Sequence, residues 1–501
     1  MIAGFKVSGR DSVALKPVVY EAGLSASISS GEFLPFYMSA NRFGVMTSSG
    51  NLLLSAGISM EMDENERFSY GFGLKLFGGI SSPVTYERFS PTGNDWTWHT
   101  ERPSSVWIQE IYGDLKWRSI YLRLGMKEEG SKLLDNRLSS GDLTRSANAR
   151  PIPQLSGGFI DFRDIPLTKG WLQIEGELAY GKFTDSRWWE KHSDFYNSKL
   201  TSGVWYTYRR LYFRTKPEMP LSVTFGVQSA ALFGGETKYY YKGQVVKTDK
   251  RGIKFADFFK ILVPVDPGDT EDFAMGNTLG SYDFRADYRL MGGDVISAYF
   301  EWPWEDGSGL AKRNGFDGLY GMKFSFAQNK VVQNILIEYL DLTNQSGPIH
   351  WAPGDHPGTG LTGQATGADD YYNNAYYQPY ANYGLGIGNA MVMSPLYNRD
   401  GYMAFIGNRM RGVHLAAEGQ ISTAMNWEVK AGWRKAYGNG YETLLPPRQA
   451  WSIAIGGNWM PEKISGLSIN FALSLDHGEL PCNSAGFSVG LNYSGNLCFL
   501  K

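Results

Sequence analysis

The chain has 501 residues, 48 basic and 50 acidic, with a formal net charge of −2. This balance argues against a nucleic-acid-binding protein, which carries a basic excess. No stretch reaches about 18 consecutive apolar residues, which argues against a membrane-spanning helix. Membrane-spanning β-strands remain compatible with the mean hydropathy of −0.30, because their alternating residues average out as polar.

The start of the chain lacks the apolar stretch of a secretory signal peptide. We expect residues 1–18 to form a short periplasmic leader and residues 19–501 to form a single barrel domain. An outer-membrane location requires an export signal, and the present chain does not contain one.

Alternation of apolar and polar residues with a period of two is the strongest pattern in the chain. Near the C-terminus, Ile453, Phe471 and Val489 belong to apolar series whose alternate positions are mostly Ser, Ala, Gly or Asn. The segments 171–183 and 281–290 alternate apolar residues with charged ones. Such alternation places the two series on opposite faces of a strand.

In chain order, this pattern predicts eighteen strands, mostly of the length that a tilted membrane strand needs, about 9–11 residues. The predicted strands cover 19–29, 51–63, 68–78, 106–117, 120–126, 156–163, 171–183, 204–214, 221–232, 281–290, 293–303, 317–327, 332–343, 403–420, 426–436, 450–460, 466–476 and 485–494.

The connections between these strands alternate in length. After odd-numbered strands they run from 8 to 59 residues, and after even-numbered strands from 2 to 7. Short turns at one end and long loops at the other are typical of outer-membrane barrels. The sequence therefore predicts an all-β protein, a transmembrane antiparallel β-barrel of about 18 strands with long extracellular loops and short periplasmic turns.

Charged side chains on the predicted strands should face the lumen, because the other face meets lipid. They could line a polar path suited to saccharides, or they could simply pair with one another across strands. The inward-facing charged residues are Glu110, Asp114, Lys116, Arg123, Glu175, Glu177, Asp283, Arg285, Asp287, Arg289, Glu418, Glu428, Lys430 and Arg434.

A short helix is predicted over residues 253–262, inside a long loop. Phe255, Phe258, Phe259 and Leu262 fall at positions i, i+3, i+4 and i+7. This helix could cap the mouth of the barrel, or it could pack on neighbouring loops.

The long loops carry aromatic side chains beside carboxylates and amides. A flat ring matches the C–H face of a sugar, and the neighbouring polar groups match its hydroxyls. The alternative is that long loops need these rings for small cores of their own. The candidate polysaccharide-binding residues are Trp188, Trp189, Trp304, Trp351, Tyr371, Tyr372, Asp369 and Asp370.

Motifs for catalysis are missing from the sequence. None of the six His lies in a metalloprotease helix motif, and neither a nucleophile elbow nor a phosphate-binding loop is present. We therefore expect a non-enzymatic protein with no catalytic residue, no metal and no cofactor. The two cysteines, Cys482 and Cys498, leave a single disulfide open as a possibility.

Nine segments, spread over most of the chain, show a family resemblance. They are PFYMSANRFG (35–44), SANARPIPQ (146–154), GNTLGSYDF (276–284), EDGSGL (305–310), DGLYG (317–321), IEYLDLTNQSGP (337–348), DDYYNN (369–374), IGN (387–389) and NRMRGVHLAAEG (408–419). Together these segments resemble the Wzi-type capsule-assembly proteins of Bacteroidetes.

The resemblance implies an 18-stranded barrel in the outer membrane of a Gram-negative bacterium. It also implies a lectin-like role, in which the barrel binds surface polysaccharide and supports capsule assembly or attachment. The implied partners are capsular or other surface polysaccharide, outer-membrane lipid and lipopolysaccharide, without nucleic acid. Better-known members carry a small periplasmic helical bundle, for which the short leader leaves little room. The alternative function is an outer-membrane diffusion channel for saccharides or small polar solutes.

Overall fold

The computed structural model describes residues 17–262, 276–305, 307–310, 312–348, 350–351 and 365–497. The predicted leader therefore lies almost wholly outside the described residues, and so does Cys498 of the possible disulfide.

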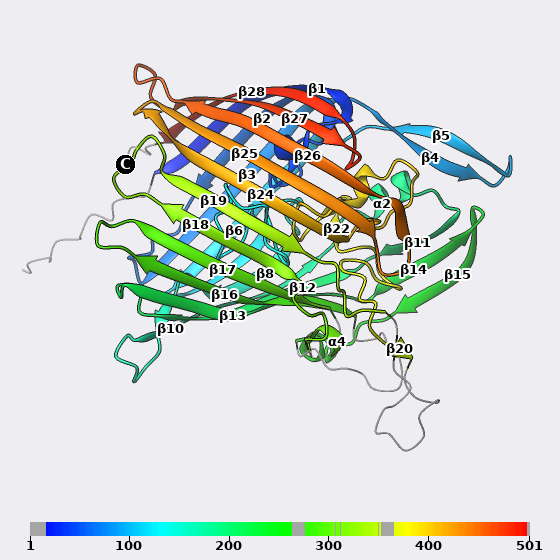
Figure 1. Ribbon diagram of the computed structural model, residues 1–501, viewed down its shortest axis with the longest axis horizontal. Coiled ribbons are helices and arrows are strands. Elements are labelled where there is room, and N and C mark those ends of the chain that lie inside the picture. Colours follow the sequence, from blue (N-terminus) through cyan, green and yellow to red (C-terminus); the bar gives the residue numbers. More distant parts are fainter. Residues whose placement is uncertain are drawn as a thin grey trace, which may run out of the picture.

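Eighteen antiparallel strands close into one barrel. The barrel is closed because β1 (Val18–Phe33) pairs with both β2 (Ser48–Met60) and β28 (Ser484–Leu497). The short strands β8 (Gln154–Phe159) and β9 (Arg163–Asp164) both pair with β10 (Leu172–Lys182), so they form one interrupted strand. This architecture confirms the predicted fold class, and the strands tilt around a common axis (Figure 1).

The other barrel strands follow in chain order and each pairs with its neighbours in the wall. They are β3 (Phe68–Ser81), β6 (Val106–Trp117), β7 (Ile120–Met126), β12 (Trp205–Thr215), β13 (Leu221–Phe233), β16 (Asn277–Arg289), β17 (Val295–Trp304), β18 (Gly318–Ser325), β19 (Asn334–Asp341), β24 (Arg409–Ser422), β25 (Met425–Gly438), β26 (Thr443–Trp459) and β27 (Leu467–Gly478).

The two faces of the wall differ as the alternation predicts. On β26, Ile453 and Ile455 are exposed on the outer face, whereas Ser452 points inward and is buried. The outer face also carries an aromatic row, in which residues on adjacent strands lie directly opposite one another. This exterior aromatic row consists of Phe213, Phe225, Phe284, Phe300, Tyr320 and Tyr339, and it continues past Val413 to Trp433 and Trp451.

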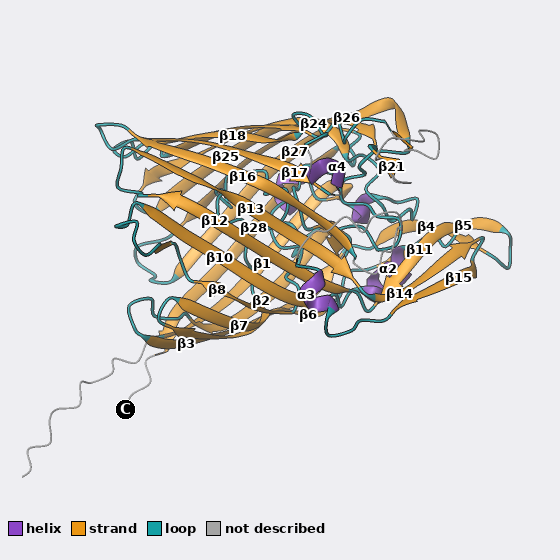
Figure 2. Cartoon of the chain, turned by 90° about the horizontal axis from the view of Figure 1, so that it is seen from below, coloured by secondary structure: helices purple, strands orange, loops and turns teal. Residues whose placement is uncertain are grey.

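The short turns lie at one end of the barrel, where Val18 pairs with Leu497. The long connections lie at the opposite end (Figures 1 and 2). The prediction that every odd connection is longer than every even one is wrong for two connections. Only residues 439–442 join β25 to β26, and only residues 479–483 join β27 to β28, whereas residues 326–333 join β18 to β19 at the other end. The Gly- and Pro-containing stretch 437–449 predicted a loop, but most of it extends the two strands beyond their expected ends.

Three of the long connections fold back into the lumen, and we call them together the plug. They cover 34–47, with α1 (Phe36–Ser39), then 127–153, and then 367–408, with β22 (Ala381–Asn382), β23 (Leu385–Gly386) and the 3-10 helix η2 (Pro395–Tyr397). All residues in 138–149 and 384–396 are buried. Phe43 donates its backbone N–H to Ala147 at 2.6 Å, and Ser146 donates to Ile387 at 2.8 Å. The three segments are therefore packed on one another.

Other long connections project beyond the barrel and form what we call the outer cap (Figure 2). The cap contains β4 (Val84–Ser90), β5 (Asp95–Glu101), α2 (Ser186–His192), β11 (Asn197–Ser202), β14 (Gly235–Tyr241) and β15 (Gln244–Arg251). β4 and β5 form a hairpin, and β11, β14 and β15 form a separate sheet. A Cβ at Gly243 would lie 2.7 Å from Pro91, so the tips of the two hairpins are in contact.

The remaining elements are short. They are α3 (Asp257–Lys260), α4 (Gly307–Leu310), β20 (His350–Trp351) and β21 (Ala365–Thr366). Among the described residues, no helix has the length and apolar character that crossing a membrane requires.

The helix predicted over 253–262 is reduced to the single turn α3. This turn neither caps the mouth of the barrel nor packs on neighbouring loops, as the two alternatives had it. Phe258 packs edge-on against Tyr180, Trp205 and Phe233, whose rings lie on the outer face of the wall. Tyr180 also donates its hydroxyl to the Phe258 carbonyl. The turn therefore covers the barrel exterior, because three outward rings offer it an apolar docking surface there.

Candidate functional site

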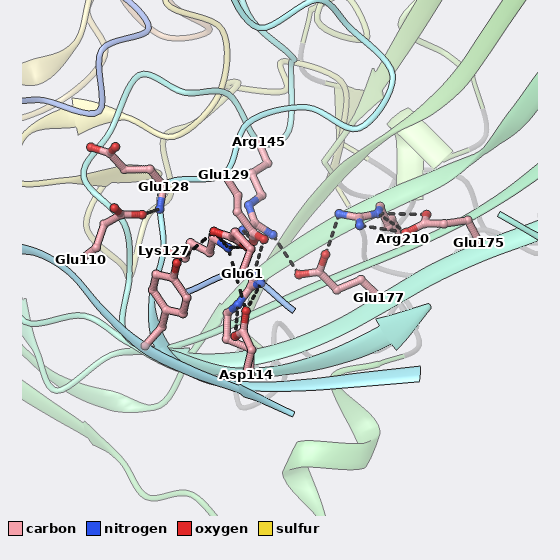
Figure 3. A network of polar contacts seen from close by, with 12 residues as sticks. Glu61, Glu110, Asp114, Lys127, Glu128, Glu129, Arg145, Glu175, Glu177 and Arg210 are labelled. Carbon is pink, nitrogen blue, oxygen red and sulfur yellow. Dashed lines mark hydrogen bonds and ion pairs between the residues drawn. The ribbon is translucent and has the colours of Figure 1, made fainter. Parts of the chain in front are cut away.

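A network of ion pairs, in which cations and carboxylates alternate, joins the plug to the barrel wall (Figure 3). Arg145 of the plug pairs with Glu177 of β10 at 3.1 Å and with Glu129 at 2.8 Å. Arg210 of β12 pairs with Glu177 at 2.6 Å and with Glu175 at 2.9 Å. The carboxylates of Glu175 and Glu177 are almost completely buried, so each depends on its arginine partners for charge compensation.

The network continues beyond Glu129, which also pairs with Arg123 of β7. Arg123 in turn binds Asp114 of β6 through two hydrogen bonds, at 2.6 and 2.8 Å. Glu110 accepts the backbone N–H of Glu128 in the plug at 2.8 Å. For Asp114, Arg123, Glu175 and Glu177, the interpretation that inward charges pair across strands is confirmed.

Uncharged donors on the plug add further contacts to wall carboxylates. Ser139 donates its hydroxyl to Glu338 of β19 at 2.6 Å, and Ser140 donates its backbone N–H to the same carboxylate at 2.8 Å. Leu143 donates its backbone N–H to Glu301 of β17 at 2.8 Å. The plug is thus bonded to strands on several sides of the barrel, which opposes free passage through the lumen.

A cavity of about 280 Å³ lies between the plug and strands β24 and β25. Tyr37, Asn41, Arg42, Arg137 and Lys430 line it, together with other residues of both plug and wall. Its volume is at the lower end of the range for ligand pockets, about 300–1,000 Å³.

The predicted polysaccharide-binding residues lie mainly in packed interiors. Trp189, Trp304, Tyr371 and Tyr372 are at most 5% exposed, and Asp369 is also 5% exposed. Burial of these rings agrees with the alternative that they pack inside the protein. Tyr371 and Tyr372 belong to the core of the plug, Trp189 packs in the outer cap, and Trp304 ends barrel strand β17. Their binding of polysaccharide stays a prediction.

Polar partners fix several of these side chains. Trp189 donates its indole N–H to Asp185 at 2.8 Å. Tyr371 donates its hydroxyl to Asp317 at 3.0 Å, and Tyr372 donates to the Leu143 carbonyl at 2.7 Å. The last contact ties the third plug segment to the second.

The other predicted residues are placed differently. Trp188 is half-buried and stacks on His192, with ring centroids 4.0 Å apart. Asp370 is half-buried and accepts hydrogen bonds from Asn373 and Asn408. The side chain of Trp351 lies outside the described residues.

Three exposed aromatic side chains, Trp96, Trp98 and Tyr241, gather instead on the outer cap. Together with the half-buried Tyr196 they form what we call the outer aromatic ridge. Trp96 is 43% exposed, Trp98 57% and Tyr241 50%. The ring centroid of Tyr196 lies 5.2 Å from that of Trp96 and 6.0 Å from that of Tyr241. The ridge therefore spans both parts of the cap, from the β4–β5 hairpin to the β14–β15 hairpin.

The β4–β5 hairpin holds the ridge in place. Trp96 and Trp98 lie two residues apart on β5, so their side chains share one face. Phe89 is opposite Trp96 on β4 and is buried beneath the ridge, 5.0 Å from the Tyr196 ring. The guanidinium of Arg399 lies 5.3 Å from the Trp98 ring. Arg399 also pairs with Glu32 of β1, so its charge is compensated within the protein. The ridge therefore presents aromatic rings to solvent without a free cation of its own.

Burial perturbs two ionisable groups at α2, behind the ridge. Burial raises the pKa of the Asp185 carboxyl to about 6. Hydrogen bonds from the backbone N–H of Tyr383 and the indole of Trp189 lower this pKa, but they are the smaller effect. Burial also lowers the pKa of the His192 imidazole to about 4. Both groups are therefore held toward their neutral forms.

The sequence did contain a signal for the ridge. Residues 84–101 read VTYERFS, then PTGN, then DWTWHTE, which is two alternating stretches around a turn-forming tetrapeptide. The prediction treated this segment as a connection between membrane strands, so the hairpin and its two tryptophans were missed.

These features define the class of protein: an outer-membrane β-barrel whose lumen holds a plug and whose long-loop end carries a cap with an aromatic ridge. No protein-family model matches the sequence, and no curated protein matches it.

Among solved structures, the fold is similar to that of Wzi from Escherichia coli, described as an outer-membrane protein involved in group 1 capsule assembly and a carbohydrate-binding β-barrel. That match has a TM-score of 0.55 and 13% identity, and it covers 95% of this chain and 85% of Wzi. It shows a shared fold.

Two barrels of another kind are also similar. OccAB2 of Acinetobacter baumannii matches with a TM-score of 0.47 and 8% identity, over 96% of this chain and 98% of that one. OccK3 of Pseudomonas aeruginosa matches with a TM-score of 0.45 and 10% identity, over 96% of each chain. These lower scores carry no argument about function.

Proposed function

We propose that this barrel binds surface polysaccharide at its outer cap and supports capsule assembly or attachment without catalysis, as a Wzi-type protein. The observation that carries the proposal is the outer aromatic ridge, which lies at the long-loop end above a plugged lumen. The similarity of the fold to a carbohydrate-binding barrel supports the proposal, as do the nine sequence segments.

The chemistry of the ridge suits a sugar chain that lies across the cap. Trp96, Trp98 and Tyr241 present flat apolar faces, which can cover the C–H faces of successive sugar rings. Loss of one stacking ring costs about 1–2 kcal/mol, which corresponds to roughly a 5- to 30-fold loss of affinity. The buried residues Trp189, Tyr371 and Tyr372 are proposed to support the cap and plug beneath this surface.

The test is binding of the purified barrel to the capsular polysaccharide of its own strain, beside capsule retention on cells. We expect the double variant Trp96→Ala/Trp98→Ala to insert normally and to bind at least 20-fold more weakly. Cells carrying it should make the polysaccharide but retain it poorly. Trp117→Ala is the matched control, since Trp117 is a similarly exposed tryptophan on a barrel strand at the short-turn end.

Unchanged binding by the double variant would remove the ridge from the proposal. A normal capsule on deletion cells, together with no glycan binding by the barrel, would remove the function itself. The diffusion-channel alternative would then require large, steady openings in a planar bilayer, which the bonded plug opposes.

A further inference from the structure

Two cations lie directly opposite each other on the outer face of the barrel. Arg411 of β24 pairs in register with Lys435 of β25. Both point away from the lumen, since their neighbours Met410, Arg434 and Ala436 are buried on the inner side. Like charges placed directly opposite on one sheet face repel each other, so this arrangement is unfavourable unless an anion lies between them.

The depth of the pair in the membrane follows from the strands. β25 begins at Met425, at the short-turn end, and Lys435 lies about ten residues along it. Arg411 lies about eleven residues from Ser422, at the same end of β24. A tilted strand crosses the hydrocarbon layer in about 9–11 residues. Both cations therefore lie where the strands leave the hydrocarbon of the outer leaflet.

An aromatic pair beside the cations supports this depth. Trp433 lies on β25, two residues before Lys435, and it faces Trp451 of β26, with ring centroids 6.3 Å apart. Tryptophan and tyrosine gather at the boundary between hydrocarbon and headgroups. The two cations lie just beyond this boundary, at the level of lipid phosphates.

The surface around Arg411 and Lys435 carries a net positive charge. Asp341 of β19 accepts from Arg411 at 2.9 Å, and Arg409 donates to the Thr343 carbonyl at 3.0 Å. Within the part of the chain that the structure describes, no carboxylate lies within ion-pair distance of Lys435. Three cations thus share one carboxylate on a surface that faces the membrane boundary.

We propose that Arg411 and Lys435, with Arg409 beside them, bind a phosphate group of an outer-leaflet glycolipid such as lipid A. The arginine offers paired N–H donors that match a phosphate, and the lysine adds a compact positive charge. The acyl chains of the same lipid then lie along the apolar wall below, beside Trp433 and Trp451. This inference is independent of the saccharide proposal, because it concerns the wall and not the cap.

The experiment measures binding of diphosphoryl lipid A to the purified barrel in mild detergent by native mass spectrometry. We expect the double variant Arg411→Gln/Lys435→Gln to bind lipid A about tenfold more weakly. The charge-conserving variant Arg411→Lys/Lys435→Arg should retain most of the affinity. Arg118→Gln is the matched control, since Arg118 also lies beside an outward tryptophan, Trp117, at the opposite end of the barrel.

Three outcomes would overturn the proposal. The first is equal binding of lipid A by the native barrel and the double variant, provided that both show the heat-dependent migration of a folded barrel. The second is equal binding of dephosphorylated lipid A, which would reduce the contact to acyl chains. The third is full competition by millimolar inorganic phosphate, which would make the patch a site for soluble anions.

Discussion

Arg145 of the plug donates to the carboxylate of Glu177 on β10 at 3.1 Å, and both side chains are nearly inaccessible to solvent. This ion pair joins a loop to the membrane wall inside the barrel. Its partners Glu129 and Arg210 extend the contact in both directions. Ion pairs with charged residues of the wall therefore hold the plug in its position.

The first prediction concerns this coupling. Arg145→Gln should loosen the plug, because Glu177 and Glu129 each lose one of two arginine partners. Glu177 keeps Arg210 and Glu129 keeps Arg123, so we expect a loss below the about 3–5 kcal/mol of a fully unpaired buried charge. We expect the native barrel to show little conductance in a planar bilayer and the variant to show frequent openings. Arg118→Gln, at the short-turn rim, is the control. Identical traces for the native protein and Arg145→Gln would mean that this ion pair does not hold the plug.

The second prediction tests the two faces of the wall. Leu473 lies exposed on the outer face of β27, whereas Asn470 faces the lumen on the same strand. Leu473→Arg should impair insertion, since an arginine facing lipid near the membrane midplane costs about 2–4 kcal/mol. Asn470→Arg should insert normally. Heat-dependent migration on gels measures both, and a reversed order would contradict the assignment of faces.

The third prediction concerns pH at α2. The folded-state pKa of His192 is lowered from 6.5 to about 4, so its protonation destabilises the cap as pH falls through this interval. The folded-state pKa of Asp185 is raised from 3.8 to about 6, so its protonation stabilises the cap as pH falls through that interval. The two effects oppose each other, and the native cap should change little between pH 7 and 5.

Single variants should separate the two effects. Asp185→Asn keeps an oxygen that accepts from the Trp189 indole, and it should make the cap about 2 kcal/mol less stable at pH 5 than at pH 7. His192→Asn should have the opposite slope, with a gain of about 1 kcal/mol over the same range. Hydrogen exchange at the α2 amides measures both slopes. Slopes of the same sign in the two variants would contradict the assignment.

The fourth prediction concerns orientation. Residues 384–396 are buried in the plug, so a protease added to intact cells should leave them uncut although they belong to a long connection. The cap should be accessible instead. In a barrel whose native Cys482 and Cys498 are replaced by serine, a cysteine at Thr92, in the β4–β5 turn, should react with a membrane-impermeant maleimide on intact cells. A cysteine at Glu64, in a short turn at the other end, should react only after lysis, and the reverse result would invert the topology.

The wall could be predicted from the sequence because its signal is local. Ile453 and Ser452 reveal the two faces of a strand within a few residues, and all eighteen predicted strands overlap observed ones. The plug could not be predicted, because its contacts join distant parts of the chain, such as Tyr372 with Leu143. An aromatic residue in a loop looks the same in sequence whether it is exposed, as Trp98 is, or buried, as Tyr371 is.

The closure of the barrel has a consequence for how the protein folds. Val18 pairs with Leu497, so the seam between β1 and β28 joins nearly the whole length of the described chain. The plug segments 34–47, 127–153 and 367–408 are bonded to one another inside that closed wall. Contacts of such sequence separation form slowly, because a long loop must close before each contact contributes. The seam can therefore seal only after β28 has been made, and we expect the plug to be inside the wall when it does.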